Sequence, residues 1–383
     1  YDDAGRTIEE VLPDVGTYRF AYVASGGTVT ETRMTDPLGN VTVYRWNGQG
    51  YEIRRTDALG RVFGKSVDYA KNLLLSETDP LGRVTRYTYD SNGNRTSIKD
   101  AEGNITLIEY HPLHNKPLTI TNALGHVMQM AYDSKGNLTS ITNAEGEITT
   151  LTYTAQGKLG SVTDPLGHKT SFEYDTEGNL VETTDALGRR TQRAYDTANR
   201  LIQAVNAYGY ATSYEYDILD RLTQTTDALG GITALAYDAK NNLLTVTDPK
   251  GAVIETNAYD LRNRLTSRRD ALGKSEGFGY DGMGNLLTRT DRKGQATTIA
   301  YDPLNRSSRV SYADGRTTEF VYDLAGNVTQ VRDSVTGEAR YAYDNLNRLI
   351  SETTDRGVIS YSYDVIGRLT ERRINGNDPA TYA

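Results

Sequence analysis

The sequence contains no cysteine, one tryptophan and five phenylalanines, and only 37 % of its 383 residues are hydrophobic. The absence of cysteine excludes disulfides, thiol catalysis and cysteine-based metal sites, although it does not decide the compartment. No run of 18 apolar residues occurs, so the sequence predicts no membrane span. With so few apolar residues, thick hydrophobic cores are not expected.

A positively charged surface is also missing. The 42 Lys and Arg residues are scattered among 50 Asp and Glu residues, for a net charge of -8, and no basic run is longer than Arg372-Arg373. We therefore expect no nucleic-acid partner. Since the chain begins with Tyr1 and not with Met, inside what resembles a repeat, we expect an internal fragment of a longer polypeptide.

Tyrosine and glycine, by contrast, are abundant, with 28 and 36 copies, and they recur at regular places. Tyr-Asp pairs return at steps of 20 to 22 residues from Tyr174 onward, with degenerate copies such as Tyr110-His111 and Tyr153-Thr154 in phase. A second series, which includes Asp79-Pro-Leu-Gly82 and Asp185-Ala-Leu-Gly188, lies between the pairs. Such a fixed period is the mark of a repeat protein.

Both series predict the same turn. Asp at the first position, Pro tolerated at the second and Gly at the fourth indicate a type I turn that closes on a residue with positive φ. Asn, the non-glycine residue that best tolerates this conformation, takes the fourth place at Asn199, Asn241, Asn263, Asn305 and Asn347. The representative turn positions that we predict are Tyr174, Asp175, Gly178, Asp185, Gly188, Tyr195, Asp196, Asn199, Asp227, Gly230, Tyr237, Asp238, Tyr280, Asp281, Gly284, Tyr322, Asp323 and Gly326.

The six or seven residues between turns fit a strand and are too few for a helix. In 169–174, Thr170, Phe172 and Tyr174 alternate with polar residues, as expected for a half-buried strand. In the other strand of each unit, Leu138 and Ile141 are an odd number of residues apart and would face opposite sides unless a bulge intervenes. The sequence leaves this point open.

The predicted fold is therefore all-β: about 16 tandem hairpins in one continuous, curved antiparallel sheet. At about 4.8 Å per strand, roughly 34 strands make a ribbon about 160 Å long, which would enclose a cavity if it were bent into a ring. We place an irregular β entry segment at 1–35 and the repeats at 36–383. The rival fold is a β-propeller, which predicts a 42-residue super-period that is not seen.

The strings Tyr174-Asp-Thr-Glu-Gly-Asn-Leu180 and Thr184-Asp-Ala-Leu-Gly-Arg189 resemble the YD repeats of the Rhs family, and the resemblance covers about 36–370. It implies the spiral wall of a hollow shell, as in bacterial Rhs polymorphic toxins, the B and C components of insecticidal toxin complexes, and teneurins. The family's Tyr-rich block ahead of the autoproteolysis site is absent, so no catalytic residue is carried over.

The resemblance implies a non-catalytic shell segment that encloses a C-terminal toxin before delivery. The implied partners are the rest of the same polypeptide, the toxin cargo and a component of a secretion apparatus. The protein would be bacterial, made in the cytoplasm and then exported. We expect no cofactor and no metal.

Two residue types allow other functions. His111-Pro-Leu-His114 could be a metal pair, but no third ligand is in sight, and His111 replaces the Asp of a Tyr-Asp turn. Rows of tyrosine could bind glycans or a receptor by stacking, whereas a cross-strand aromatic ladder that stabilises the sheet is the plainer interpretation.

Overall fold

The computed structural model describes residues 1–12, 16–376 and 380–381. The description leaves out 13–15, in the predicted entry segment, and 377–379 and 382–383, in the predicted repeat region. In the described part the secondary structure consists of 36 strands without a helix. The chain divides into two units: unit 1 comprises 1–108, 121–125 and 276–383, and unit 2 comprises 109–120 and 126–275. The division into an entry segment at 1–35 and repeats at 36–383 stays a prediction.

Unit 1 contains two runs of strands. The first run is β1 (Glu9–Leu12), β2 (Gly16–Ser25), β3 (Thr28–Thr35), β4 (Val41–Trp46), β5 (Glu52–Thr56), β6 (Val62–Asp68), β7 (Leu73–Thr78), β8 (Val84–Tyr89), β9 (Arg95–Lys99) and β10 (Ile105–Tyr110), whose last two residues belong to unit 2. The second run is β26 (Ser275–Tyr280), β27 (Leu286–Thr290), β28 (Ala296–Tyr301), β29 (Ser307–Ser311), β30 (Thr317–Tyr322), β31 (Val328–Asp333), β32 (Gly337–Tyr343), β33 (Leu349–Thr354), β34 (Gly357–Tyr363), β35 (Leu369–Ile374) and β36 (Ala380–Thr381).

Unit 2 holds the most regular repeats. Its strands are β11 (Pro117–Thr121), β12 (Val127–Tyr132), β13 (Leu138–Thr142), β14 (Ile148–Tyr153), β15 (Leu159–Thr163), β16 (Lys169–Tyr174), β17 (Leu180–Thr184), β18 (Arg190–Tyr195), β19 (Leu201–Val205), β20 (Ala211–Tyr216), β21 (Leu222–Thr226), β22 (Ile232–Tyr237), β23 (Leu243–Thr247), β24 (Val253–Tyr259) and β25 (Leu265–Asp270).

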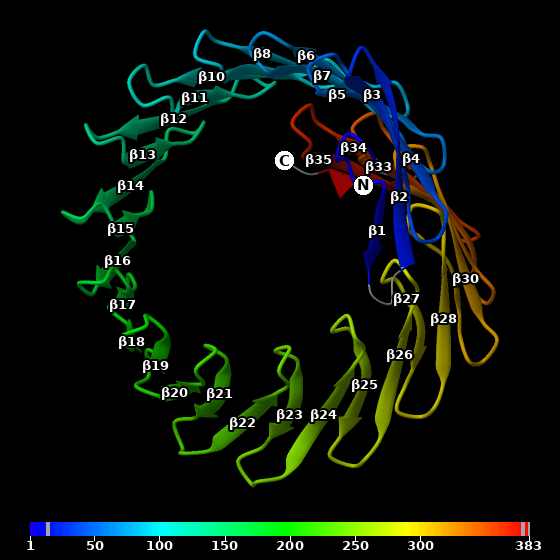
Figure 1. Cartoon of the computed structure of the whole chain (residues 1–383). Helices are drawn as coiled ribbons and strands as arrows, with labels where there is room; N and C mark the ends of the chain where they lie inside the picture. Colours follow the sequence, from blue (N-terminus) through cyan, green and yellow to red (C-terminus); the bar gives the residue numbers. More distant parts are fainter. Residues whose placement is uncertain (13–15, 377–379, 382–383) are drawn as a thin grey trace. The chain divides into compact units, whose positions relative to one another are not determined.

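Each strand pairs antiparallel with its neighbour in sequence. This order holds from β12 to β25 in unit 2, and in unit 1 from β1 to β10 and from β26 to β36. In Figure 1 the strands of unit 2 lie side by side in one curved layer. The predicted all-β fold of consecutive hairpins in a curved antiparallel sheet is confirmed. Because pairing continues from one repeat to the next, these strands do not group into the blades of a propeller.

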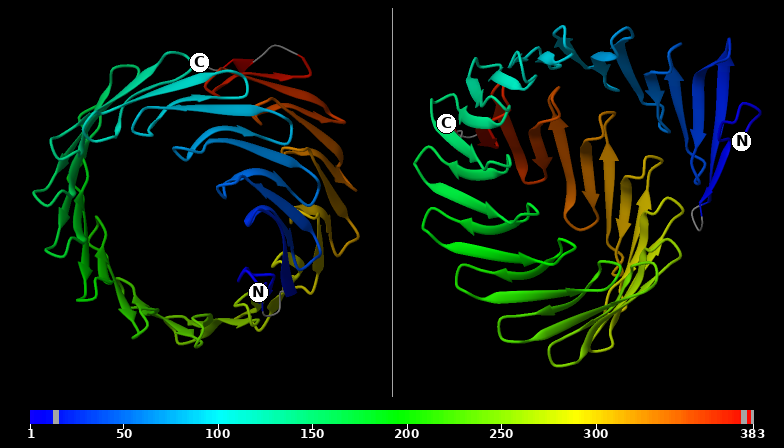
Figure 2. Two further views of the ribbon diagram at one scale, coloured as in Figure 1. Left: turned by 45° about the horizontal axis from the view of Figure 1, so that its top comes forward. Right: turned by 60° about the vertical axis from the view of Figure 1, so that its left-hand side comes forward.

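The turns lie on the two long edges of each run, as the right-hand view of Figure 2 shows. One edge carries the turns that follow Tyr, and we call it the Tyr-Asp edge. The other carries the Asp-x-Leu-Gly series, and we call it the Leu-Gly edge. Both edges therefore end in closed turns, and the backbone groups within the sheet are paired with neighbouring strands.

One turn illustrates the local chemistry. Gly188 donates its N–H to the Asp185 carbonyl over 2.9 Å, Asp185 donates its own N–H to Arg189 over 3.0 Å, and Gly188 has φ +77°. This is a three-residue hairpin loop, a type I turn closed by a left-handed residue. The same positive φ occurs at Gly178 (+92°), Gly230 (+84°), Gly284 (+93°) and Gly326 (+99°), and at Asn199 (+61°).

A bulge follows each regular Tyr-Asp turn. Tyr132 is opposite Leu138 while Ala131 is opposite Ser140, so Thr139 is an extra residue in β13. The same shift occurs between β14 and β15 and between β16 and β17. The bulge resolves the question that the sequence left open, since it lets Leu138 and Ile141 lie on the same face despite their odd spacing.

The sheet has no conventional core. No large side chain among the described residues is fully buried, and the exposure of the strands alternates between intermediate and exposed, as in β14. One face of each strand is therefore only partly sheltered by its neighbours. The stability of such a layer must come mainly from the backbone ladders, the turns and contacts between adjacent strands.

The turn geometry generates a first prediction. Gly188→Val should destabilise the protein by about 1 kcal/mol or more, because a β-branched residue is strained at positive φ. Thermal unfolding followed by circular dichroism measures the change. Gly188→Asn is the matched control, since Asn occupies the equivalent position at Asn199 with φ +61°, and it should cost less. Equal unfolding temperatures for the parent and Gly188→Val would contradict the assignment.

Candidate functional site: the turn edges and their seam

A carboxylate at the first residue organises most of the turns. In 185–189, Asp185 Oδ1 accepts the N–H groups of Leu187 and Arg189, both at 2.9 Å, while Oδ2 accepts Nε of Arg189 at 2.6 Å. The turn at Asp175 uses Asn179 in the same way, through its N–H at 2.7 Å and its side-chain amide at 3.0 Å. The residue after the left-handed position thus closes the turn with its side chain.

These hydrogen bonds stabilise the charged form of the carboxylate. The N–H of Arg189 lowers the pKa of Asp185, and the side-chain amide of Asn179 lowers the pKa of Asp175. At Asp344 burial raises the pKa, but hydrogen bonds from Arg348 outweigh it and the pKa is lowered overall. Because these pKa values lie below those of the unfolded chain, their contribution is present at neutral pH and is lost as the pH falls below about 4.

The fifth turn residue also connects consecutive turns of the Tyr-Asp edge. Arg221 reaches one repeat ahead, where its Nη1 donates to the Asp238 carbonyl at 2.7 Å and to Asn241 Oδ1 at 3.2 Å, and its guanidinium lies 5.0 Å from the ring centre of Tyr237. Where the fifth residue is Asn, its amide donates instead to the fourth residue of the next turn, as from Asn242 to Asn263 at 2.9 Å. The fifth turn position therefore links neighbouring repeats whether it holds Arg or Asn.

Tyrosine hydroxyls provide a second link. The backbone ladder between β15 and β16 ends at the pair Ser161 and Ser171, before the Tyr-Asp edge, and there Tyr174 donates its hydroxyl to the Leu159 carbonyl at 3.0 Å. The same bond over about 15 residues recurs from Tyr153, Tyr195, Tyr216, Tyr237, Tyr301 and Tyr343. The hydroxyl thus substitutes for a ladder hydrogen bond where the strands separate.

The tyrosines do not form the expected aromatic ladder in unit 2. Stacked ring pairs in the described part include Tyr44 with Trp46 and His111 with His114, but none joins two Tyr-Asp tyrosines between 132 and 259. Our interpretation of a ring ladder is wrong there, because the rings turn toward the edge to place their hydroxyls on backbone carbonyls.

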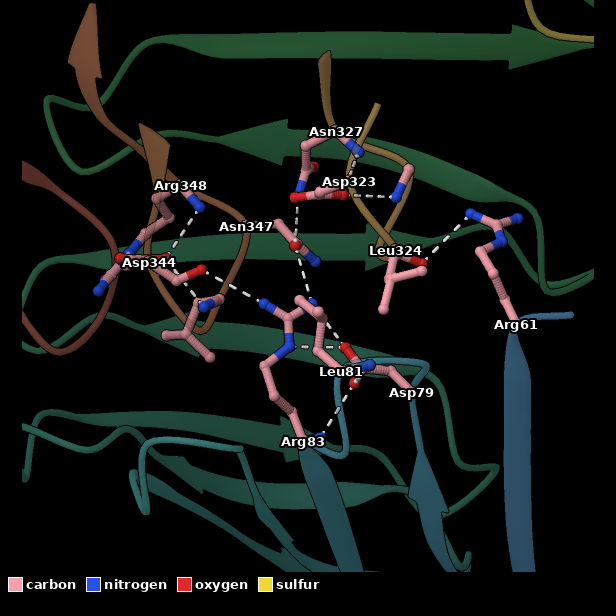
Figure 3. A network of polar contacts seen from close by, with 12 residues as sticks. Arg61, Asp79, Leu81, Arg83, Asp323, Leu324, Asn327, Asp344, Asn347 and Arg348 are labelled. Atoms are coloured by element: carbon pink, nitrogen blue, oxygen red, sulfur yellow. Dashed lines mark hydrogen bonds and ion pairs between the residues drawn. The ribbon is translucent and has the colours of Figure 1, made fainter. Parts of the chain in front are cut away.

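In unit 1, the Leu-Gly edge of the first run meets the Tyr-Asp edge of the second run, and Figure 3 shows this seam. Arg83 lies at its centre. Arg83 Nη1 donates to the Asp344 carbonyl at 3.3 Å and its Nη2 donates to Asn347 Oδ1 at 2.9 Å, while Nε remains on Asp79 of its own turn at 2.6 Å. Arg83 therefore uses the same two acceptors, a first-position carbonyl and a fourth-position amide oxygen, that Arg221 uses along the edge.

Further contacts extend the seam on both sides of Arg83. Arg61 Nη1 donates to the Leu324 carbonyl at 3.2 Å, and Arg348 Nη2 lies 3.3 Å from the Glu102 carboxylate. Toward the start of the chain, the Tyr18 hydroxyl is 3.6 Å from Met283 Sδ. Two cavities of about 490 and 380 Å³ flank the turn that carries Leu346, and residues of both runs line them.

Most contacts of the seam have a similar offset in sequence. The residues joined by Arg61, Arg83 and Tyr18 are 261 to 265 apart, whereas Arg348 and Glu102 are 246 apart. The Asp344 carbonyl accepts an arginine from the first run because the preceding Tyr-Asp turn of its own run supplies none. That turn ends in Asn327, whose amide binds Asn347 at 2.7 Å. Arg83 contacts the Asp344 carbonyl in the way that Arg221 contacts Asp238. The sequence predicted the turns but not this contact.

The described residues contain no group of three or more His, Cys, Asp or Glu side chains that could hold a metal ion. His111 and His114 stack with ring centres 4.5 Å apart. Within the described ranges, no helix is long and apolar enough to cross a membrane.

The tyrosine bond generates a second prediction. Tyr174→Phe should destabilise the protein by about 0.5 to 1.5 kcal/mol, because it removes one hydrogen bond and keeps the ring. Chemical unfolding measured by circular dichroism tests it. Tyr208→Phe is the matched control, because Tyr208 lies in a turn with its side chain 80 % exposed, and this variant should behave like the parent. Indistinguishable Tyr174→Phe and Tyr208→Phe proteins would refute the role of the hydroxyl.

The seam generates a third prediction. Arg83→Ala should lower the free energy of unfolding of unit 1 by about 1.5 to 3 kcal/mol, since it removes hydrogen bonds from a charged donor. Hydrogen exchange at 344–348 should rise in parallel. Arg189→Ala is the control, because Arg189 has the same bond to its own turn Asp but its side chain is 56 % exposed, against 11 % for Arg83. If the seam contributes nothing to stability, both variants should show the same small loss in the free energy of unfolding.

Chains in several solved structures are similar to this one. A chain in the structure of a Photorhabdus luminescens Tc holotoxin pore with a mutation in TccC3 is 19 % identical, with a TM-score of 0.44; the match covers 98 % of this chain and 21 % of that one. A chain in the crystal structure of TcdB2-TccC3 is 18 % identical, with a TM-score of 0.43 and coverages of 98 % and 22 %. The chain thus spans about a fifth of the length of these chains. No curated protein matches the sequence.

Two family models match defined parts of the sequence. The RHS Repeat model matches residues 68–105, 132–169, 156–190, 174–211, 195–232 and 216–253, and the Teneurin YD-shell model matches 253–380. Both models describe the same kind of repeat, and together they account for 68–105 and 132–380. The turn at Asp185, the bulge at Thr139 and the link from Arg221 lie within these matched regions, and the chain belongs to the Rhs/YD-repeat family.

Proposed function

We propose that this chain is wall material of an Rhs-type shell, a non-catalytic segment that encloses a C-terminal toxin domain until delivery. The observation that carries the proposal is the seam of unit 1. There, two runs of a one-layer sheet are joined edge to edge through Arg61 and Arg83, so the layer can be widened without a second sheet on its face.

The physical role of such a wall is steric. Strands that pair continuously leave no strand edge open along the ribbon, and both long edges end in hydrogen-bonded turns. A protease needs several residues of extended, accessible backbone, which this layer does not offer.

The partners follow from this role. The wall would be completed by the rest of the same polypeptide, would hold the toxin as cargo, and would be handed to a secretion apparatus for export from a bacterial cytoplasm. The match of residues 253–380 to the Teneurin YD-shell model supports the shell part of this proposal. The nature of the cargo and the delivery route are carried by the family resemblance alone.

Protease protection tests the proposal. The natural polypeptide that contains this chain and its C-terminal region is digested with a broad-specificity protease, and survival of the C-terminal region is followed by mass spectrometry. We expect that region to survive much longer than the same region expressed alone. The double variant Arg61→Ala/Arg83→Ala should accelerate its digestion, because it opens the seam, whereas Arg189→Ala should not.

Two outcomes would contradict the shell. One is digestion of the C-terminal region at equal rates with and without the repeats. The other is an electron-microscopy reconstruction that shows a solid two-layer sandwich with no lumen. A glycan array in which tight binding depends on the tyrosines would instead favour a glycan- or receptor-binding module.

A further inference from the structure

One turn of the Tyr-Asp edge in unit 2 begins with an imidazole in place of a carboxylate. In the turn 111–116, His111 donates its backbone N–H to the Lys116 carbonyl at 2.8 Å, and its own carbonyl accepts the N–H of Asn115 at 3.0 Å. The turn has one residue more than the turn at Asp185, and it closes on Asn115, with φ +50°. The other three histidines, at 114, 126 and 168, do not hold the first position of a turn.

The His111 side chain takes the role that Asp has in other turns. Its Nδ1 accepts the N–H of Leu113 at 3.2 Å. Asp68 in unit 1 begins a turn of the same length, and there Oδ1 accepts the N–H groups two and three residues later at 3.0 and 3.3 Å. Asn72 closes that turn with φ +55°, as Asn115 closes this one. An imidazole nitrogen accepts a hydrogen bond only while it carries no proton, so the closed turn requires a neutral His111.

A second imidazole packs on the first. The rings of His111 and His114 stack with their centres 4.5 Å apart, and their centres lie 6.0 and 6.5 Å from that of Tyr132 in the next repeat. His114 also lies against Gly136 in the next Tyr-Asp turn, where a Cβ atom would be 3.1 Å from its Nδ1. In a regular repeat an arginine guanidinium lies beside the tyrosine. The two histidines therefore fill the contact between successive turns.

The carboxylates that flank this pair in unit 2 are bound elsewhere. Asp133 uses its carboxylate within its own turn, and Glu109 accepts a threonine hydroxyl at 2.9 Å. The flanking cations are Lys116, whose Nζ donates to a carbonyl of the next turn at 2.6 Å, and Lys135 in that turn. Burial raises the pKa of Tyr132, so its hydroxyl stays neutral. A positive charge on either imidazole would therefore meet other cations without a free carboxylate to balance it.

His168 has the opposite arrangement. It holds the fifth position of a Leu-Gly turn, and its Nδ1 lies 2.8 Å from Oδ2 of Asp164. A proton on His168 strengthens this pair, because the new charge is opposite to that of the carboxylate. In the part of the chain that the structure describes, neither His111 nor His114 has an ion pair with a carboxylate. Acid should therefore weaken the first of these turns and strengthen the second.

We propose that the turn 111–116 is an acid-sensitive switch: uptake of a proton at Nδ1 of His111 opens it at a pH at which the Asp turns stay closed. The proton comes from solvent, and the lone pair that accepted the Leu113 N–H forms the new N–H bond. Two donors then face each other. Since the open turn binds a proton that the closed turn excludes, closure is disfavoured as the pH falls from about 8 to about 5. Turn carboxylates stay charged down to about pH 4.

The switch is local, and it goes beyond the proposed shell. Lys116 links this turn to the next one, so opening of the turn loosens the Tyr-Asp edge from β11 to β13. The rest of unit 2 keeps its carboxylate turns. The protease-protection result at neutral pH does not depend on this opening, and the opening does not depend on a cargo.

Hydrogen exchange of the full chain, followed by mass spectrometry at about pH 7.5 and about pH 5.5, tests the switch. Rates are converted to protection factors, which removes the pH dependence of exchange in an unfolded peptide. Protection at 111–116 should fall about three- to tenfold at the lower pH, the effect expected from the loss of one hydrogen bond. Protection at 164–168, 175–179 and 185–189 should change less than about twofold, because those carboxylates stay charged.

The decisive variant is His111→Asp. It follows Asp68, whose carboxylate already accepts two N–H groups in a turn of this length, so 111–116 should stay protected at both pH values. His168→Asn is the control, since Asn179 holds the fifth position of another turn, and it should leave the loss at 111–116 unchanged. Equal protection of the parent at both pH values, a loss of similar size in the Asp turns, or an acid loss that persists in His111→Asp would each overturn the proposal.

Discussion

Most repeats of this protein depend on one interaction, the capture of two backbone N–H groups by the side chain of the first turn residue, usually an Asp carboxylate. In the turn at Asp185 this leaves the second carboxylate oxygen for the side chain four residues later. That side chain is consequently held at the edge, with its other polar atoms pointing away from the turn. The link to the next repeat and the seam of unit 1 both use those atoms, so they exist only because the turn is built this way.

A sheet of this kind is stabilised differently from a globular domain. Without fully buried side chains, a substitution inside a strand has little core to disturb, whereas the edges concentrate charge-assisted hydrogen bonds and partly buried tyrosines. Variation among the turns of this chain fits this view. Asn47 replaces Asp at the first position and still accepts two N–H groups, at 3.0 and 2.8 Å, so the geometry of the acceptor is kept when its charge is not.

The repeat and the all-β hairpin fold could be predicted from the sequence because both depend on local chemistry. Asp, Gly and Asn at fixed spacing specify a turn wherever they occur, and short strands follow from the distance between turns. The bulge at Thr139 could not be predicted, because it depends on how the Tyr-Asp turn fixes register with the neighbouring strand. The role of Tyr174 was missed for a similar reason: its acceptor is a backbone carbonyl 15 residues away, which has no sequence signature. The contact between Arg83 and Asp344 could not be predicted either, because 261 residues separate them in the sequence. In sequence Arg83 and Arg189 occupy the same motif, and only the path of the ribbon makes one a seam residue.

The two edges are out of phase by half a repeat, since a Tyr-Asp turn and a Leu-Gly turn alternate every 10 or 11 residues. A Leu-Gly turn can therefore face a Tyr-Asp turn across the seam only when an odd number of strands lies between the two turns in the chain. Gain or loss of a complete hairpin preserves this condition, because each edge moves by one full step. Gain or loss of a single strand would put like edges together and set arginine against arginine. Lengthening of such genes should therefore proceed in units of about 21 residues, with the half-step of about 10 disfavoured by the structure itself.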